Sequence, residues 1–207
     1  MKTRDRILQT SLQLFNEEGA PRITTNHIAD EMNISPGNLY YHFRNKDEII
    51  FNLFLSYEKK ISDALQVPQS RDLNMEDMWL YLHLVFESIW EYRFLYRDLE
   101  NILSRSRKLR LRFKRILERK IKTAVAIFDG LVRAKVMQAS AEEIQALATN
   151  VAVIATYWIN FYNIRHDDHS NGNKLGLGVY QVMALVSPFL REDMRKLLQK
   201  LSHDYLD

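Results

Sequence analysis

A short segment near the N-terminus is unusually rich in hydroxyl, amide and aromatic side chains. It reads Ser35-Pro36-Gly37-Asn38-Leu39-Tyr40-Tyr41-His42-Phe43. Leu39 and Phe43 are four residues apart, so they share one face of a helix and are predicted to point inward. The other positions then present polar groups outward, where they suit phosphate oxygens and base edges. The chemistry predicted for this run is noncovalent recognition of DNA.

The residues before this run complete a helix-turn-helix. Thr24 or Thr25 can cap a short helix over residues 24–32, and Asn33 suits a turn that requires a positive φ. Ser35 is a good N-cap for the second helix, and Pro36 fits its first position. In a helix-turn-helix this second helix enters the major groove with its N-terminal end. The alternative, a helical hairpin that only packs, leaves the polar outer face unexplained.

The candidate DNA-binding residues are polar or allow close approach of the backbone. Gly37 lets the backbone come near DNA, Asn38 suits a base edge, and tyrosine, histidine and lysine groups suit phosphates. The complete set is Thr24, Thr25, Ser35, Pro36, Gly37, Asn38, Tyr40, Tyr41, His42 and Lys46. Residues 1–60 carry eight basic and eight acidic side chains, so affinity must come from individual contacts and not from net charge.

Residues 24–50 resemble the DNA-binding signature of the TetR/AcrR family of bacterial repressors. The matching residues are Thr24-Thr25, Ile28-Ala29, Ser35-x-Gly37-x-Leu39-Tyr40-x-His42-Phe43 and the basic Lys46. Asn33 stands where the family usually has glycine, and we expect the turn to be kept because Asn tolerates a positive φ. The resemblance covers residues 24–50, which is 27 of the 207 residues. It implies an all-helical dimer whose C-terminal body binds a small effector that lowers DNA affinity.

The elements that must position these residues are helices. The chain has 207 residues, of which 46% are apolar, and only 6 are Gly and 4 Pro, so it is too apolar for disorder and poor in hairpin formers. Helical spacing predicts an all-α fold with a head over residues 1–46 and a body over 47–207. Long helices are expected at about 75–96, 106–136 and 140–165, followed by two more that break at Ser187-Pro188.

Several classes of protein are disfavoured by what the sequence lacks. It has no cysteine, no run of about 18 apolar residues and no apolar leader after Met1, so we expect a cytoplasmic protein with no membrane partner. It also lacks a Gly-rich phosphate loop, His-Glu-x-x-His and Gly-x-Ser-x-Gly. We therefore expect no enzyme and no cofactor, which argues against one alternative, a DNA-tethered enzyme.

Aromatic residues gather in the predicted body and suggest an effector pocket. Four of them follow helical spacings of four, three and four, although for any single aromatic a place in the core is the simpler explanation. Because the resemblance implies a pocket, the candidate effector-binding residues are Trp79, His83, Phe86, Trp90, Trp158 and Tyr162. Such walls suit an apolar, aromatic or fatty-acyl ligand. A body that binds a protein partner is the alternative; a closed pocket would argue against it, and a filled core would favour it.

The last long helices are apolar over a wide arc, which favours burial against a second copy of the chain. Small residues among them permit close helix approach, and the resemblance places a four-helix dimer interface here. The candidate interface residues are Ile144, Ala148, Ala152, Ala155, Ile159, Val179, Val182, Met183 and Val186. Ordinary packing within one chain is the alternative explanation for part of each helix.

Two charged segments carry weaker signals. Residues 104–135 hold twelve basic and two acidic side chains, which predicts a solvated face, long-range attraction of DNA or a site for an anionic effector such as an acyl-CoA. The run His166-Asp167-Asp168-His169 has metal-binding residue types. No rigid element fixes their geometry, so we expect a solvated connector there and no metal.

Overall fold

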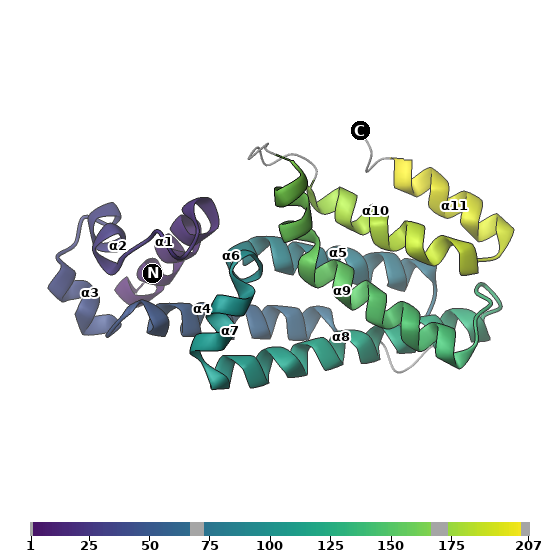
Figure 1. Ribbon diagram of the computed structural model, residues 1–207, viewed down its shortest axis with the longest axis horizontal. Coiled ribbons are helices and arrows are strands. Elements are labelled where there is room, and N and C mark those ends of the chain that lie inside the picture. The colour runs from purple at the N-terminus through teal and green to yellow at the C-terminus, as the bar shows by residue number, and fades with distance from the viewer. Residues whose placement is uncertain (1, 67–72, 167–173, 204–207) are drawn as a thin grey trace. The chain divides into compact units, whose positions relative to one another are not determined.

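The computed structural model describes residues 2–66, 73–166 and 174–203, with side chains as far as residue 198, and these residues are almost entirely helical (Figure 1). Within them the only β-type pairing is an isolated bridge between Met137 and Leu190. Contacts divide the chain into unit 1, residues 1–60 and 91–113, and unit 2, residues 61–90 and 114–207. The predicted all-α class is confirmed. The predicted head ends at residue 46, whereas the contacts assign residues 1–60 and 91–113 to unit 1.

Unit 1 contains the helix-turn-helix and a later segment that packs on it. Its helices are α1 (Thr3–Glu18), α2 (Thr25–Glu31), α3 (Pro36–His42), most of α4 (Lys46–Ala64), α6 (Arg93–Arg97), α7 (Leu99–Arg105) and the start of α8 (Arg107–Arg133). The amide of Asn16 explains why the later segment joins the head. Its Nδ2 donates to the carbonyl of Glu91 at 2.7 Å, and its Oδ1 accepts from the backbone N–H of Phe94 at 3.0 Å.

The turn between α2 and α3 follows the predicted local chemistry. The Thr24 hydroxyl accepts from the N–H of His27 at 3.2 Å, and the Ser35 hydroxyl accepts from the N–H of Asn38 at the same distance. Asn33 has a φ of 54°, which lies in the left-handed region. These two caps and the positive φ confirm that the sequence encodes a helix-turn-helix at this place.

Unit 2 contains the end of α4 and the body helices. These are α5 (Met75–Glu91), the rest of α8, α9 (Ala141–Arg165), α10 (Lys174–Val186), a short 3₁₀ turn at Ser187–Phe189 and α11 (Glu192–His203). The predicted helix over residues 75–96 is interrupted at Tyr92, after which α6 begins. At Ser140 the expected capping box is present, because Ser140 and Glu143 each bind the other's backbone N–H.

Within unit 2, α9 and α10 pack closely along one another (Figure 1). Gly178 marks the closest approach: a Cβ there would lie 2.5 Å from Phe86 and 2.7 Å from Trp158. By length and composition alone α9 is apolar enough to cross a membrane, but 44% of its most apolar window is buried in this structure.

Candidate nucleic-acid interface

Helix α3 is held by two buried side chains and turns its polar face outward. Leu39 and Phe43 are fully buried, as their spacing predicts. Tyr41 is 85% exposed and Tyr40 is 48% exposed. Large side chains gain by leaving water, so the exposure of Tyr41 on the outer face of a two-turn helix is not explained by the stability of the head. Tyr41 is available to another molecule.

The N-terminal end of α3 offers open backbone. A Cβ added at Gly37 would meet only the Ser35 hydroxyl, at 3.9 Å, so the fold itself does not require glycine there. Ser35, Pro36 and Asn38 are also exposed. The N–H groups at the start of a helix attract anions, and an absent side chain lets a phosphate approach them closely. This end of α3 therefore suits a DNA backbone.

Other predicted contact residues lie around this surface in different ways. The Thr25 hydroxyl is 3.0 Å from the Tyr40 hydroxyl, so this hydrogen bond links α2 to α3. The rings of Tyr41 and His42 meet edge to face at 5.1 Å between centroids. Thr24 is engaged as the cap of α2. Tyr41 and His42 thus form an outward pair, while Thr25 and Tyr40 also hold the two helices together.

Lys46, a predicted phosphate contact, also has a structural role in the head. Its ammonium donates to the carbonyls of Ala20 at 2.8 Å and Ile23 at 3.0 Å, so it fixes the loop that leads into α2. Burial lowers the pKa of Lys46, and the nearby Arg105 lowers it further, while Asp47 and Asp98 oppose the shift. Two of its three donors are therefore used within the head, so Lys46 positions the loop before α2, and its contact with a phosphate stays a prediction.

The predicted effector residues separate into groups. Trp79 and His83 are partly exposed and stack with their ring centroids 3.9 Å apart. Phe86 and Trp158 are brought together at Gly178, and the indole N–H of Trp158 donates to the Lys174 carbonyl at 2.8 Å. Tyr162 neighbours Trp158, with 6.0 Å between ring centroids, and Trp90 is half-buried.

Two small cavities lie in the interior of unit 2, near some of these residues. Each has a volume of about 10 Å³; both are lined by α5, α8 and α9, and one is also lined by α10. Phe86 lines one of them, whereas the other five predicted effector residues line neither. Each cavity is no larger than a water molecule requires. The predicted aromatic stripe therefore does not enclose a preformed pocket at these two places.

The predicted dimer residues require correction. All nine are at most 6% exposed within the single chain: Ile144, Ala148, Ala152, Ala155, Ile159, Val179, Val182, Met183 and Val186. The physical reason is that α5 and α8 cover this side of α9 and α10; Val151 and Val182, for example, border the same small cavity as Met78 and Phe128. Side chains already removed from water have no further area to bury in a dimer.

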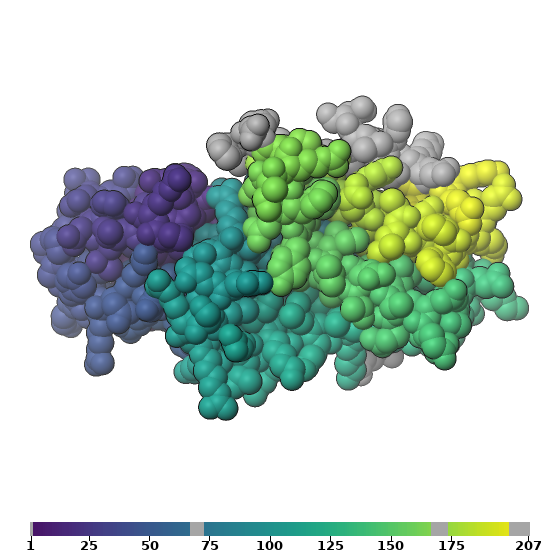
Figure 2. All heavy atoms as spheres, viewed as in Figure 1, coloured from purple at the N-terminus to yellow at the C-terminus, as the bar shows by residue number. Residues whose placement is uncertain are grey.

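The opposite side of α9 carries an apolar stripe that the sequence analysis missed. Val153, Tyr157, Phe161 and Ile164 are exposed, and Ile164 reaches 86%. The C-terminal half of α9 stands open on the face of unit 2 seen in Figure 2. The spacings of four, four and three between these residues were the signal that could have revealed the stripe. We refer to these four residues as the α9 stripe.

The basic segment is mostly a solvated face, with one exception. Most of its lysines and arginines are exposed, and Arg112 is paired with Glu58. Lys120 instead is 2% exposed and borders one of the small cavities of unit 2. Of the run from His166 to His169, residues 167–169 lie outside the described part of the chain, and within that part no cluster of metal-binding residues occurs.

Comparisons with known proteins agree with this arrangement. Residues 7–53 match the family model of bacterial regulatory proteins of the tetR family, and residues 56–198 match that of TetR-type bacterial transcriptional repressors. The chain belongs to the TetR family. A TetR-family transcriptional regulator from Marinobacter aquaeolei is 40% identical, with 99% of each chain covered and a TM-score of 0.90.

More distant relatives of this TetR-family protein share one region or the fold alone. A helix-turn-helix regulator of Staphylococcus aureus is 37% identical over 70 residues, which is 30% of this chain but only 38% of the relative. A regulator from Saccharomonospora viridis, solved in complex with choline, is 16% identical with a TM-score of 0.70, over 91% of this chain and 98% of the other. That likeness shows the fold and nothing about ligands.

Proposed function

We propose that this protein is a cytoplasmic, dimeric repressor that binds a palindromic operator and is released by a small effector. The observation that carries the DNA-binding part is the outward face of α3, where the backbone is open at Gly37 near the N-terminal end and Tyr41 and His42 lie in the last turn. Such a helix lies in the major groove, with base contacts at its N-terminal end and phosphate contacts around it. Asn38 is the candidate for a base edge.

The α9 stripe supports the proposed dimer. Four exposed apolar side chains in a row on one helix are unfavourable in water, and a second copy of the same stripe would bury them. An isologous pair of α9 helices gives a two-fold axis. The operator would then be an inverted repeat with half-sites about 10 bp apart, or a multiple of that distance.

The proposed effector is an apolar, aromatic or fatty-acyl compound that binds in unit 2. Phe86 and Trp158 are the best supported of the six candidate residues because both lie against Gly178. The small cavities near Phe86 mean that the core must open to admit a ligand of useful size. Opening of this kind would couple ligand binding to a change in DNA affinity.

A second candidate function is favoured by the small size of the two interior cavities described above. In it, the helical body binds a protein partner, and DNA binding is controlled through that complex. The two candidates differ in where the regulator binds: in the interior beside Phe86 for a small molecule, or on exposed helix faces for a protein. Methyl NMR distinguishes them. Shifts of interior methyl signals on addition of an aromatic or fatty-acyl compound would favour the small molecule.

Selection of genomic fragments by the full-length protein, followed by footprinting, tests the proposed function. The expected result is a protected inverted repeat near a promoter. Addition of the effector should then raise the dissociation constant for that site. If selected fragments bind no better than random DNA of the same length, DNA recognition by this protein is refuted.

A further inference from the structure

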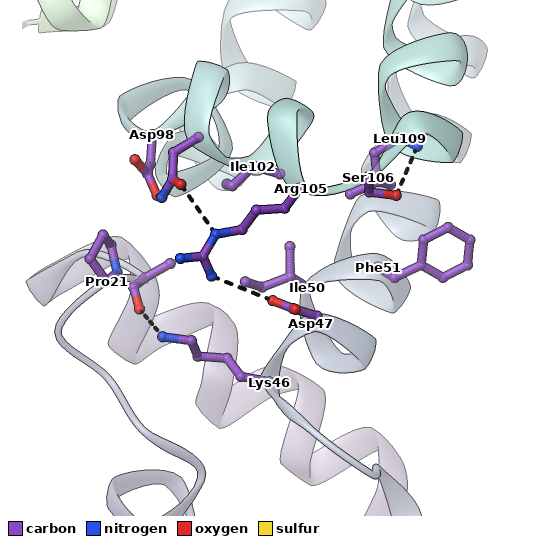
Figure 3. A pocket seen from close by; sticks show the side chains of 12 residues that line it. Pro21, Lys46, Asp47, Ile50, Phe51, Asp98, Ile102, Arg105, Ser106 and Leu109 are labelled. Atoms are coloured by element: carbon purple, nitrogen blue, oxygen red, sulfur yellow. Dashed lines mark hydrogen bonds and ion pairs between the residues drawn. The ribbon is translucent and has the colours of Figure 1, made fainter.

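Unit 1 contains a cavity of about 300 Å³ that none of the predicted sites includes. It lies between the first turns of α4, the loop after α1, helix α7 and the start of α8 (Figure 3). Its size falls at the lower end of the range in which proteins bind small organic molecules. Ala20 and Lys46, which hold the loop before α2 in place, form part of its wall. The cavity therefore touches the head directly.

Two cations face this cavity from opposite walls. Figure 3 shows Arg105 reaching from α7 toward Asp47, with Lys46 on the α4 side. Each cation is only partly engaged. Lys46 uses two of its three donors on backbone carbonyls, and Arg105 donates through Nε to Asn101 at 3.2 Å. The remaining donors of both side chains are open to a ligand.

The carboxylates of the cavity do not fully compensate these cations. The nearest Asp47 oxygen is 3.9 Å from Arg105 Nη1, which is too far for a hydrogen bond, and the Asp47 side chain is 67% exposed. Asp98 already accepts a hydrogen bond from Asn101 at 2.9 Å. Arg105 in turn disfavours the charged form of Lys46. An anion placed between Lys46 and Arg105 would relieve that repulsion.

The rest of the wall is apolar. Pro21, Ile50, Phe51, Ile102 and Leu109 line the cavity beside the charged groups. Phe51 also carries the Lys108 ammonium over its ring, 4.6 Å from the centroid. An occupant that matches this wall needs an apolar body as well as an anionic end. Inorganic phosphate or sulfate would leave the apolar wall exposed to water and therefore fits the cavity poorly.

We propose that this cavity is a second ligand site, which binds a small organic carboxylate with an aromatic or branched apolar body. The carboxylate bridges Arg105 and Lys46, and it replaces the long contact between Arg105 and Asp47. A planar carboxylate suits the guanidinium because both can form two parallel hydrogen bonds. The apolar body lies against Ile50, Ile102 and Leu109. Bound ligand ties α7 to the first turn of α4.

This site is separate from the effector site proposed in unit 2 and does not depend on it. Its residues belong to one compact unit, so its ligand can be measured without DNA and without the body's effector. Since Lys46 fixes the loop before α2, occupancy also changes how firmly the head is held. DNA affinity should therefore change when this ligand binds. The proposal itself concerns only binding of the ligand to this cavity.

Calorimetry and methyl NMR on the full-length protein test the proposal, with 3-phenylpropionate and its neutral amide as probes. We expect the acid to bind at least about tenfold more tightly than the amide, which corresponds to about 1.4 kcal/mol. The acid should shift the methyl signals of Ile50 and Ile102. Arg105→Met should reduce acid affinity to that of the amide, whereas the control Arg107→Met, an exposed residue at the next helix start, should not.

Asp47→Asn provides a test in the opposite direction. It removes a negative charge that competes for Arg105, so acid affinity should rise, while a nonspecific loss of structure would lower it. Equal affinity for acid and amide, or an Arg105→Met variant that binds the acid as the wild type does, would overturn the proposal. So would the absence of saturable binding of the acid at millimolar concentration.

Discussion

At the scale of single residues, Asn33 and Lys120 each make an unfavourable contribution to the stability of the fold. Asn33 has a φ of 54°, a region that costs a non-glycine residue about 1–2 kcal/mol, although Asn tolerates it best. Lys120 lies in the interior of unit 2, where desolvation penalises its charge. The first cost could be predicted from the local sequence. The second could not, because burial of one lysine in a basic helix is decided by tertiary packing.

Replacement of Asn33 tests the turn. Asn33→Ala should lower the free energy of unfolding by about 1 kcal/mol, because alanine has no side-chain polar group to support a positive φ. Asn33→Gly should stay close to the wild type, since relief of the backbone strain is offset by the greater entropy of glycine in the unfolded chain. Urea unfolding midpoints measure both. A loss as large for glycine as for alanine would mean that the Asn side chain, and not φ, matters.

Lys120 makes stability depend on pH. Burial lowers the pKa of Lys120 from its ordinary value of 10.5 to about 7. Between these values the folded state has released the proton and the unfolded state still binds it, so stability rises with pH. Lys120→Met should lose part of this rise, because it removes the group that titrates. Lys122→Met, at an exposed position, is the matched control. The melting temperature of each variant is measured across the alkaline range. Identical pH profiles for Lys120→Met and wild type would contradict this explanation.

At the scale of elements, α9 shows which features a sequence specifies and which it leaves open. Its start at Ser140 and its end near Arg165 follow from a capping box and from helical spacing. The direction of each face does not, because both sides of this helix are apolar. Ile159 is buried by other helices of the same chain, while Tyr157 is exposed. Periodicity alone does not reveal which apolar face the rest of the chain covers.

The two faces of α9 should respond differently to charge. Ile164→Glu, on the exposed stripe, should turn a dimer into a monomer while leaving the melting temperature of the isolated chain nearly unchanged, because it adds no buried charge. Ile159→Glu, on the inner face, should unfold unit 2 because a carboxylate would lose its hydration. Sedimentation equilibrium and circular dichroism distinguish these results. A dimer that survives Ile164→Glu unchanged would exclude this end of α9 from the interface.

At the scale of the whole molecule, the excess positive charge lies in a different part of the chain from the helix-turn-helix. The formal net charge is only +3, yet residues 104–135 alone contribute +10 and residues 1–60 contribute zero. A neutral head must rely on individual contacts, and we propose that the outward side chains and the open N-terminus of α3 make them. A basic α8 can raise the rate of encounter with DNA, but it supplies no sequence preference. The helix-turn-helix could be predicted because its caps, glycine and tyrosines are local features, whereas the cavity beside Arg105 joins segments far apart in the sequence.

Equilibrium binding of the full-length protein to its selected inverted repeat, followed by fluorescence anisotropy, tests the central claim most directly. Tyr41→Ala should weaken binding at least about tenfold, or about 1.4 kcal/mol, because the exposed ring and hydroxyl of Tyr41 would otherwise contact DNA. Gln9→Ala, an exposed change on α1, should bind as the wild type does. If Tyr41→Ala binds the repeat as tightly as the wild type, or if the wild type does not prefer the repeat to scrambled DNA, α3 is not the helix that reads the operator.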